Sequence, residues 1–362
     1  MKKKKTIIIA AGGSGGHVIP GLTIANVLKK HWNVQWIGTN NHIESILVPK
    51  NNIKIHFIQV IGFREQTIIQ KIMSIMYILC ACYYSAKIIK KIKPDVILGM
   101  GNYISIPVIL TAWLYKVPTI IHEQNAIAGL TNKLLSKISN LTLQGFPNTI
   151  PYAYFVGNPI RKKLLSIPSP QQRLKKRIGP IRILVMGGSQ GSKTINTILP
   201  KIAQELSNNF IFWHQVGNNP KILNLVKNNY IQLCGKKAKK YKIVTFIRNM
   251  YKAYFWADLV ICQSGAMTVS EITQIGIPAL FIPFTHKDQQ QYFNAKTLEK
   301  IGAAKIIHKS KTTTNKIIEI LKKINRKILL KMAKLAKTQS KPNSTKKIIK
   351  YIKLIKKNNF HT

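Results

Sequence analysis

Short apolar runs alternate with longer segments of helical periodicity from one end of the chain to the other. The apolar runs predict strands at Thr6–Ala11, Val34–Ile37, Ile53–Ile58, Asp95–Leu98, Thr119–His122, Leu141–Leu143, Ile181–Met186, Phe210–Gln215, Ile243–Phe246, Leu259–Cys262 and Ala279–Ile282. Helical patterns lie between them, notably over Leu22–Lys30 and Thr67–Lys91. Such alternation is typical of an α/β fold, in which crossover helices connect parallel strands.

A Pro-rich and basic segment over about Gly157–Pro180 interrupts the alternation. We therefore predict two Rossmann-like domains facing each other across a cleft. The first spans 1–157, a linker or hinge spans 158–180, and the second spans 181–340, with a C-terminal helix at about 341–362 that packs back on the first domain. The chain has 362 residues, 46% of them hydrophobic, which is enough for a core in each half.

Three glycine-rich stretches directly follow predicted strands. They are Gly12-Gly13-Ser14-Gly15-Gly16-His17, Gly99-Met100-Gly101-Asn102-Tyr103 and Gly187-Gly188-Ser189-Gln190-Gly191. A glycine loop between a strand and a helix exposes backbone N–H groups at the positive end of the helix dipole, which suits a phosphate group. Because both halves carry such loops, we expect the chain to bind two phosphorylated substrates.

Other kinds of phosphate site lack their residues. Neither the first nor the third loop fits G-x-G-x-x-G, and G-x-x-x-x-G-K-[ST] is absent. No Asp-x-Asp occurs among the ten acids, so a divalent metal ion has no obvious ligands. The loops therefore favour a diphosphate held by backbone groups and helix dipoles alone.

The charge balance is strongly basic, with 57 Lys plus Arg against 10 acids and a formal net charge of +47. Such a balance raises nucleic acid or an anionic membrane as a partner. Lys is spread along the whole chain, however, and is accompanied by many Ile and Asn, as A+T-rich coding would produce. The charge alone therefore specifies no partner, and we expect no specific nucleic acid. The four cysteines show neither metal-ligand spacing nor a disulfide framework, which fits a reducing cytoplasm.

The longest apolar stretch, Ile72–Tyr84, is too short for a bilayer span of about 20 residues. Lysines flank it on both sides. One interpretation is a buried amphipathic helix. The other is an apolar patch with a basic rim that docks on anionic lipid.

Two ionisable residues are candidates for direct roles. His17 lies at the expected start of a helix, where a neutral imidazole could take a proton from an attacking hydroxyl, or could simply bond backbone or phosphate. Glu271, in the first turn of a helix expected after Leu259–Cys262, could accept two ribose hydroxyl bonds, or could only stabilise the helix dipole.

Amides also cluster after predicted strands. The segment His286-Lys287-Asp288-Gln289-Gln290-Gln291 follows one strand, and His122-Glu123-Gln124-Asn125 follows another. Side-chain amides both donate and accept hydrogen bonds, so they suit sugar hydroxyls, although an exposed polar helix start would look the same. Arg161 lies in the predicted linker, from which it could reach a phosphate or a uracil.

Seven motifs occur in an order that resembles the MurG family of bacterial peptidoglycan glycosyltransferases. They are GGSGGHVIPGL, LGMGNYISIP, HEQNAIAGLTNK, VGNPIR, VMGGSQGS, SGAMTVSEI and PALFIPFTHKDQQQ, and they cover about Lys5 to Ile307. The resemblance implies a GT-B fold and an enzyme that transfers N-acetylglucosamine from UDP-GlcNAc to the C4 hydroxyl of the N-acetylmuramyl unit of lipid I, with inversion. It implies no organic cofactor and a peripheral location on the cytoplasmic face of the inner membrane.

The resemblance also assigns roles to individual residues. The donor UDP-GlcNAc would contact Ser14, Gly15, Gly16, Asn125, Arg161, Ser189, Ile247, Ala266, Met267, Thr268, Val269, Ser270, Glu271, Gln290 and Gln291. The acceptor would contact His17, Gly101, Asn102 and Tyr103, with His17 as the candidate base.

Three residues depart from the family pattern. Asn102 stands where a second glycine is usual, and Gln263 and Gln289 stand where Arg is common, which puts the closeness of the acceptor and the affinity for the anionic donor in doubt. Two alternatives stay open: another GT-B transferase with a different lipid acceptor, and a basic nucleic-acid-binding protein.

Overall fold

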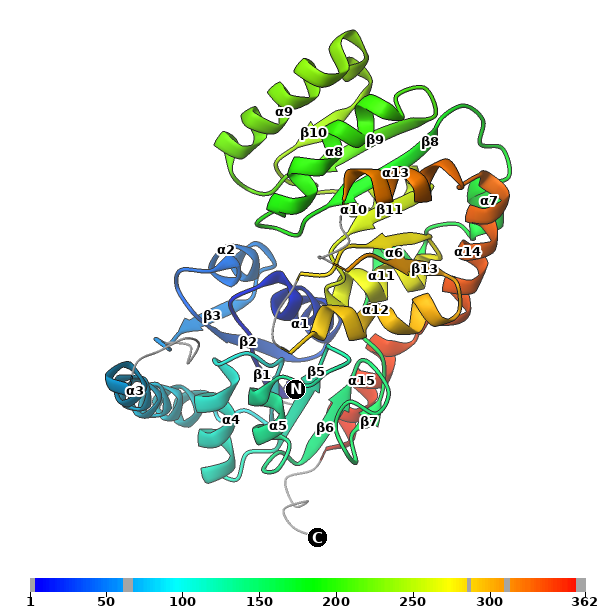
Figure 1. Ribbon diagram of the computed structural model, residues 1–362. Coiled ribbons are helices and arrows are strands. Elements are labelled where there is room, and N and C mark those ends of the chain that lie inside the picture. Colours follow the sequence, from blue (N-terminus) through cyan, green and yellow to red (C-terminus); the bar gives the residue numbers. More distant parts are fainter. Residues whose placement is uncertain (1–3, 61–67, 285–287, 309–312, 356–362) are drawn as a thin grey trace. The chain divides into compact units, whose positions relative to one another are not determined.

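The computed structural model describes residues 4–60, 68–284, 288–308 and 313–355, with only the backbone of 68–75 (Figure 1). Its contacts divide the chain into two units. Unit 1 is Met1–Arg161 with Asn343–Thr362, and unit 2 is Lys162–Pro342. Each unit is a parallel α/β sheet flanked by helices, and together they have the two-domain GT-B fold class.

Unit 1 contains a seven-stranded parallel sheet of order β3-β2-β1-β4-β5-β6-β7. Its strands are β1 (Thr6–Ala10), β2 (Asn33–Gly38), β3 (Lys54–Phe57), β4 (Val96–Gly99), β5 (Thr119–Glu123), β6 (Leu141–Gln144) and β7 (Tyr154–Phe155). Its helices are α1 (Gly15–Leu28), α2 (Ile43–Lys50), α3 (Ile68–Ile92), α4 (Ser105–Leu114), α5 (Leu130–Leu135) and α15 (Ser344–Leu354).

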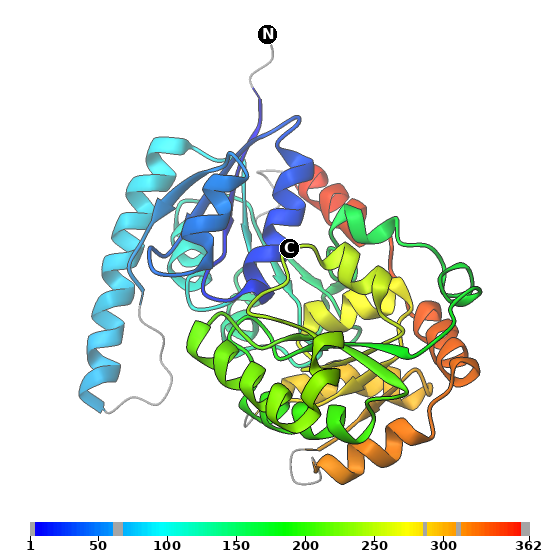
Figure 2. The same cartoon turned by 90° about the horizontal axis from the view of Figure 1, so that it is seen from above.

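The central strands β1 and β4 are buried on both faces, which is why they are almost continuously apolar. Ile7 and Ile9 of β1 face one core, to which α1 and α15 contribute. Ile8, between them, faces a second core built with α3 and α4, as the alternation of side chains along a strand requires. The last helix, α15, lies beside α1 although more than 300 residues separate them (Figure 2).

Unit 2 contains a six-stranded parallel sheet of order β10-β9-β8-β11-β12-β13. Its strands are β8 (Ile181–Met186), β9 (Phe210–Gln215), β10 (Lys242–Val244), β11 (Leu259–Cys262), β12 (Ala279–Phe281) and β13 (Ala304–Ile306). Its helices are α6 (Lys162–Leu165), α7 (Pro170–Leu174), α8 (Lys193–Glu205), α9 (Pro220–Cys234), α10 (Met250–Trp256), α11 (Ala266–Ile275), α12 (Gln290–Lys300), α13 (Thr314–Lys322) and α14 (Arg326–Thr338), with a 3-10 turn η1 (Gly235–Lys240).

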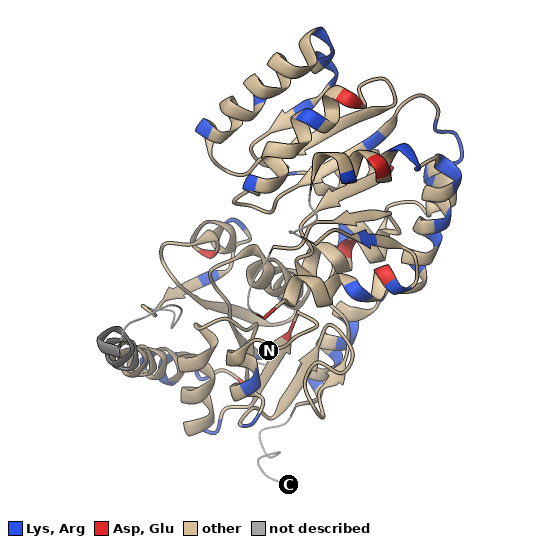
Figure 3. Cartoon of the chain, viewed as in Figure 1, with Lys and Arg blue, Asp and Glu red and all other residues tan. Residues whose placement is uncertain are grey.

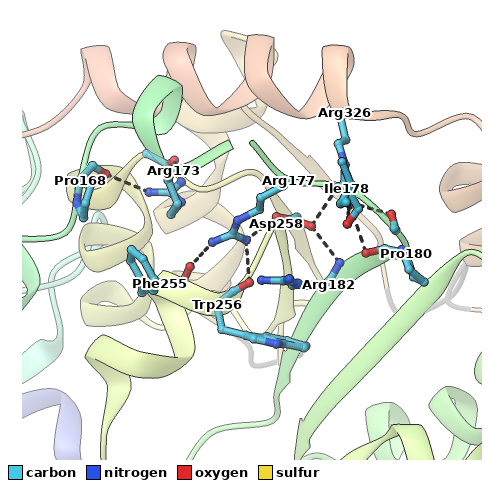
Figure 4. Close-up of polar contacts among 12 residues, drawn as sticks. Pro168, Arg173, Arg177, Ile178, Pro180, Arg182, Phe255, Trp256, Asp258 and Arg326 are labelled. Atoms are coloured by element: carbon cyan, nitrogen blue, oxygen red, sulfur yellow. Dashed lines mark hydrogen bonds and ion pairs between the residues drawn. The ribbon is translucent and has the colours of Figure 1, made fainter. Parts of the chain in front are cut away.

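Arginines join the first segment of unit 2 to the ends of α10 and α11 and to Asp258 (Figure 4). Arg173 is buried and donates to the carbonyl oxygens of Gly276 at 2.6 Å and of Ile275 at 3.4 Å, at the C-terminal end of α11. The buried carboxylate of Asp258 pairs with Arg177 and, at 3.2 Å, with Arg326. Burial lowers the pKa of Arg173 to about 10. Because a buried cation needs such partners, this segment is held firmly to unit 2.

The strands predicted from the apolar runs are confirmed, with ends that differ by at most two residues. Two short strands, β7 and β13, have no clear signal in the sequence. The segment expected as a linker holds α6 and α7, and from Lys162 it belongs to unit 2. No helix in the described ranges is both long and apolar enough to cross a membrane.

Candidate active site

The topology of each sheet places the glycine loops at its switch point. In unit 1 the chain leaves β1 toward β2 on one side, while β4 begins the other side; in unit 2 the corresponding strands are β8 and β11. In open parallel sheets, ligands bind at the carboxyl ends of the strands where the order reverses. The three glycine loops follow β1, β4 and β8, and the segment 264–271 follows β11.

The first loop leaves backbone donors without partners at the start of α1. Ser14 is the N-cap residue, and its carbonyl oxygen accepts from the N–H groups of His17 and Val18, both at 3.2 Å. For the N–H groups of Gly15 and Gly16, no acceptor occurs in the described part of the chain. These two donors, at the positive end of a 14-residue helix, suit an anionic ligand.

A buried carboxylate that the sequence pattern did not single out shapes this loop. Glu44, in the first turn of α2, is fully buried and accepts from the N–H of Gly13 at 3.1 and 3.2 Å. It also accepts from the backbone N–H of Thr39 at 3.1 Å and from the Thr39 hydroxyl at 2.5 Å. A Cβ on Gly12 would lie 2.5 Å from Glu44 Oε1, so this approach needs a glycine.

The second loop meets the first. Gly101 and Asn102 both adopt left-handed conformations, with φ of +83° and +68°. The amide of Asn102 donates to the carbonyl of Gly12 at 2.9 Å and accepts from the N–H of Tyr103 at 2.7 Å. Burial, with a smaller effect of Glu44, raises the pKa of Tyr103. The predicted acceptor residues of this loop therefore lie together, beside the first loop.

His17 joins the two loops to the segment after β5. Its Nδ1 lies 2.9 Å from the carbonyl oxygen of Met100 and 3.0 Å from Oε1 of Gln124. Glu123, at the end of β5, is buried. Its carboxylate accepts from the backbone N–H of Asn125 at 2.9 Å and from Asn125 Nδ2 at 3.1 Å. Unit 1 thus gathers His17, the two loops and Asn125 at one end of its sheet.

In unit 2, close backbone contacts set the third loop. The φ of Gly191 is +80°, and a Cβ there would lie 2.0 Å from the carbonyl oxygen of Val216. Ser189 is exposed, and its carbonyl oxygen accepts from Asn218 N at 3.0 Å. The 13-residue helix α8 begins just after this loop, so its N-terminus faces any ligand bound there.

Gln215, which the sequence pattern did not mark, connects this loop to Ile247. Its Nε2 donates to the carbonyl oxygen of Gly188 at 2.9 Å, and its Oε1 accepts from the Ile247 N–H at 2.9 Å. The side chain is buried at the end of β9. One amide therefore holds the predicted diphosphate loop and the predicted uracil contact in a fixed relation.

Glu271 is not in the first turn of its helix, which corrects the sequence expectation. The helix α11 begins at Ala266, so Glu271 is its sixth residue, and the first turn carries no acid. Glu271 is 5% exposed and accepts from the hydroxyl of Tyr254 on α10 at 3.1 Å. At this position it gains little from the helix dipole, which weakens the dipole interpretation. Ala266, Met267, Thr268, Val269 and Ser270 form the turn before it.

The two glutamines of α12 differ in their contacts. The Oε1 of Gln291 accepts from the N–H groups of Ser264, at 3.1 Å, and of Phe284, at 2.9 Å, so it joins the loops after β11 and β12. The N–H of Gln290 donates to Asp288 at 3.2 Å. His286 and Lys287 lie outside the described residues, and Arg161 is the last residue of the first part of unit 1. Across the described ranges, no three His, Cys, Asp or Glu side chains cluster as metal ligands would.

Comparisons with known proteins agree along the whole chain. The glycosyltransferase family 28 N-terminal domain matches residues 7–143, and the family 28 C-terminal domain matches 182–352. The UDP-N-acetylglucosamine--N-acetylmuramyl-(pentapeptide) pyrophosphoryl-undecaprenol N-acetylglucosamine transferase of Buchnera aphidicola subsp. Schizaphis graminum is 52% identical, over 96% of this chain and 97% of its own. The transferase of the same name from Haemophilus influenzae is 46% identical, over 98% and 99%.

Solved structures give the same relationship. A crystal structure of Acinetobacter baumannii MurG is 32% identical, with a TM-score of 0.81, over 98% of this chain and 100% of that one. The chain belongs to the MurG family, within glycosyltransferase family 28. An S. aureus MnaA–UDP structure, 13% identical with a TM-score of 0.67, shares the fold.

One of the departures from the MurG family pattern has a local explanation. Asn102 adopts the left-handed φ that a glycine would favour, and asparagine tolerates it better than most residues. Its side chain adds the bond to Gly12 that a glycine would lack. Gln263 lies beside the third loop, since a Cβ on Gly188 would lie 3.4 Å from its Oε1. A neutral amide there replaces the cation that is common in the MurG family.

Proposed function

We propose that the protein transfers N-acetylglucosamine from UDP-GlcNAc to the C4 hydroxyl of the N-acetylmuramyl unit of lipid I, undecaprenyl-pyrophosphoryl-MurNAc-pentapeptide. The products are lipid II and UDP, formed with inversion at the anomeric carbon during peptidoglycan synthesis, on which cell wall growth, shape and division depend. The observation that carries this proposal is the 52% identity, over nearly the whole chain, to a transferase named for that reaction. The glycine loops of both units supply the chemistry it needs.

Unit 2 binds the donor in this proposal. The third loop, with Ser189, and the N-terminus of α8 receive the diphosphate. Glu271 accepts the ribose hydroxyls, and the backbone of Ile247 contacts the uracil. Gln290 and Gln291 read the GlcNAc hydroxyls, with Asn125 and Arg161 completing the donor contacts from unit 1. The buried positions of Glu271 and Gln215 support this assignment, because both hold backbone or side-chain partners that fix them in place.

Unit 1 binds the acceptor. Gly101, Asn102 and Tyr103 face the acceptor diphosphate together with the first loop, whose Ser14, Gly15 and Gly16 also lie near the reaction centre. His17 removes the proton of the attacking hydroxyl. The orphan N–H groups of Gly15 and Gly16 support a negatively charged ligand at this helix end.

The reaction is a direct displacement. The acceptor oxygen attacks the anomeric carbon while UDP leaves from the opposite face, so positive charge develops on the sugar and negative charge on the diphosphate. Oriented N–H groups of the third loop and the dipole of α8 stabilise the leaving group. The proton of the attacking hydroxyl goes to His17, so the new glycosidic oxygen is uncharged.

The protein binds at the inner-membrane surface from the cytoplasmic side in this proposal. Met76, Leu79, Tyr83 and Tyr84 are 53–61% exposed and recur at helical spacing on α3. The adjacent helix α4 adds Trp113 and Leu114, and lysines border the patch: Lys87 Nζ lies 4.5 Å from the Tyr83 ring and Lys90 Nζ 5.2 Å from the Tyr115 ring. An apolar stripe with a basic rim suits an anionic lipid surface.

A transfer assay tests the proposed function. Radiolabelled UDP-GlcNAc is expected to label lipid I, and UDP-GalNAc is expected to give little transfer. His17→Ala should lower kcat by ~10²–10⁴-fold, the usual loss of a general base, with little change in UDP affinity. Absence of transfer to lipid I, with transfer to another polyprenyl or diacylglycerol acceptor, would contradict the acceptor assignment; unchanged turnover of His17→Ala would contradict the base.

A further inference from the structure

A chain of hydrogen bonds runs from His17 to the backbone at Gly157, entirely within unit 1. Nδ1 of His17 lies 3.0 Å from Gln124 Oε1. Nε2 of Gln124 lies 2.9 Å from the carbonyl oxygen of His122 and 3.1 Å from His122 Nδ1. Nε2 of His122 lies 3.1 Å from the carbonyl oxygen of Gly157. Gln124 and His122 are both buried, so water does not replace these bonds.

The direction of each bond follows from its fixed ends. The carbonyl oxygen of His122 can only accept, so the NH₂ group of Gln124 must face it, and the amide oxygen must face His17. The carbonyl oxygen of Gly157 can likewise only accept, so His122 carries its proton on Nε2. Its Nδ1 is then free to accept from Gln124. The opposite orientation of the amide would place two oxygens 2.9 Å apart.

The same logic decides the proton of His17. Among the described residues, its Nδ1 faces two acceptors, Gln124 Oε1 and the carbonyl oxygen of Met100 at 2.9 Å, and no donor. A neutral imidazole has one N–H, and it must therefore be on Nδ1. The lone pair is left on Nε2, which is the nitrogen that a base uses.

We propose that Gln124 is a positioning residue that fixes the tautomer of His17, and that His122 fixes Gln124 in turn. This inference rests on the proposed function only for the consequence in catalysis. The backbone of Gln124 is also held, because Asn158 Nδ2 donates to its carbonyl oxygen at 2.9 Å. Gln124 is thus held by hydrogen bonds to both its main chain and its side chain. Its side-chain amide cannot rotate by 180° without breaking three hydrogen bonds.

The side chain of Gln124 carries no charge, and this matters for its role. A carboxylate at this place would also accept from His17 Nδ1–H, but it would favour the imidazolium and so delay the loss of its proton to higher pH. Burial lowers the pKa of His122 to about 4, so the second imidazole also stays neutral in the working range. The chain of hydrogen bonds from His17 to Gly157 therefore orients His17 without adding charge beside it.

The first test reads the tautomer directly. Protein labelled with ¹⁵N-histidine is examined by long-range ¹H–¹⁵N correlation at neutral pH, with His17→Gln used to assign the His17 signals. We expect the wild type to show the Nδ1–H form. A predominant Nε2–H form would overturn the inference, whatever the enzyme's acceptor is, because this measurement uses no substrate.

The second test uses Gln124→Met and Gln124→Glu in the transfer assay. Gln124→Met keeps the length of the side chain but removes its hydrogen-bond acceptor. We therefore expect kcat to fall by roughly tenfold or more, a smaller decrease than the ~10²–10⁴-fold expected when the base itself is lost. The KM for UDP-GlcNAc should stay near the wild-type value. Gln124→Glu should move the acidic limb of the kcat/KM profile to higher pH.

A matched control tests whether the effect of Gln124→Met comes from the hydrogen-bond chain at His17 or from the loss of any Gln–His bond. Gln35 Oε1 lies 2.7 Å from His56 Nε2 in the same unit, and this bond joins β2 to β3. Gln35→Met should leave kcat and the pH profile unchanged. Equal effects of Gln35→Met and Gln124→Met, or an unshifted profile for Gln124→Glu, would contradict the positioning role. If the wild type failed to use lipid I, the proposed function would fall while the tautomer result still stood.

Discussion

The carboxylate of Glu44 accepts the backbone N–H of Gly13, although 31 residues separate them in the chain. The first glycine loop is therefore held by a buried carboxyl group from α2. This bond fixes the shape of the loop just before Gly15 and Gly16, whose N–H groups have no acceptor among the described residues.

Glu44→Ala is expected to lower the free energy of unfolding and to impair acceptor binding. It removes the acceptor of the Gly13 and Thr39 donors, and leaving buried donors unpaired costs about 1–3 kcal/mol. Thermal unfolding and the KM for lipid I measure the two effects. Glu319→Ala is the control, because Glu319 is exposed and its pair with Lys316 at 3.3 Å should contribute little. Similar losses for both variants would mean that the carboxylate of Glu44 has no special part.

Gly101→Ala should reduce turnover more than its backbone strain alone explains. At φ +83° any Cβ is strained, by roughly 1–2 kcal/mol, and here it would lie 3.0 Å from Asn132 Nδ2 and 3.5 Å from the His17 ring. Gly179→Ala is the matched control, since its φ is +73° and a Cβ there would meet nothing within 4 Å. Steady-state kinetics and melting temperature should show a stability loss in both and an activity loss only in Gly101→Ala.

Glu271→Ala should weaken donor binding through the ribose. Loss of charge-assisted hydrogen bonds is worth roughly 1.5–3 kcal/mol, so we expect the Kd of UDP to rise by about tenfold to 150-fold. Calorimetry with UDP and 2′-deoxy-UDP makes the test specific, because the variant should lose the wild-type preference for UDP. Tyr254→Phe removes the hydroxyl that donates to Oε2 and should cost tenfold or less. A preference for UDP that survives in Glu271→Ala would rule out the ribose contact.

The protein should lose stability as the pH falls below 6.5. Burial lowers the pKa of His122 to about 4 and of His214 to about 3, from an ordinary value of 6.5. Between these values the unfolded chain binds protons that the folded protein does not, so the free energy of unfolding decreases with decreasing pH, by about 1.4 kcal/mol for each pKa unit of difference. Urea unfolding between pH 7.5 and 4.5 measures the slope. His214→Gln should be less stable at neutral pH, and its free energy of unfolding should depend less on pH. An unchanged slope would mean that groups other than His214 cause the loss of stability at low pH.

Membrane binding should depend on the stripe of α3. We expect the protein to bind anionic vesicles, less so as salt is raised, because screening weakens the lysine contribution. Leu79→Ser should weaken binding, whereas Leu225→Ser, at a similarly exposed leucine on α9, should not. Vesicle co-sedimentation distinguishes the two. Equal binding to neutral vesicles would contradict an electrostatic contribution to membrane binding. Equal effects of the two variants would contradict a role for the apolar residues of α3.

Much of the fold could be predicted because buried parallel strands leave a local signature. Ile7, Ile8 and Ile9 are apolar in succession since both faces of β1 are covered, and the glycines after β1 mark the loop directly. The two-residue strand β7 is exposed and too short for such a pattern. Membership of the MurG family was predicted from the order of motifs, and the comparisons confirm it.

The partners of the site residues could not be read from the sequence. Gln215 meets Ile247 and Glu44 meets Gly13 only after the sheets have formed, and many glutamines and glutamates have no such role. Glu271 was placed in the first turn because the start of α11 could not be fixed from the glycines alone. The roles of His17 and the donor residues remain predictions that the variants above test.

The burial of Glu44, Glu123, Asp258 and Glu271 removes four of the ten acids from the outside of the protein. Lysines and arginines meanwhile occur on elements of both units (Figure 3). The solvent-facing shell is thus even closer to a polycation than the composition indicates, and it must carry a dense atmosphere of small anions. Adhesion to heparin, nucleic acid or glass is the default behaviour of such a shell, so a soluble polyanion competitor is needed before any lipid adsorption is credited to one face.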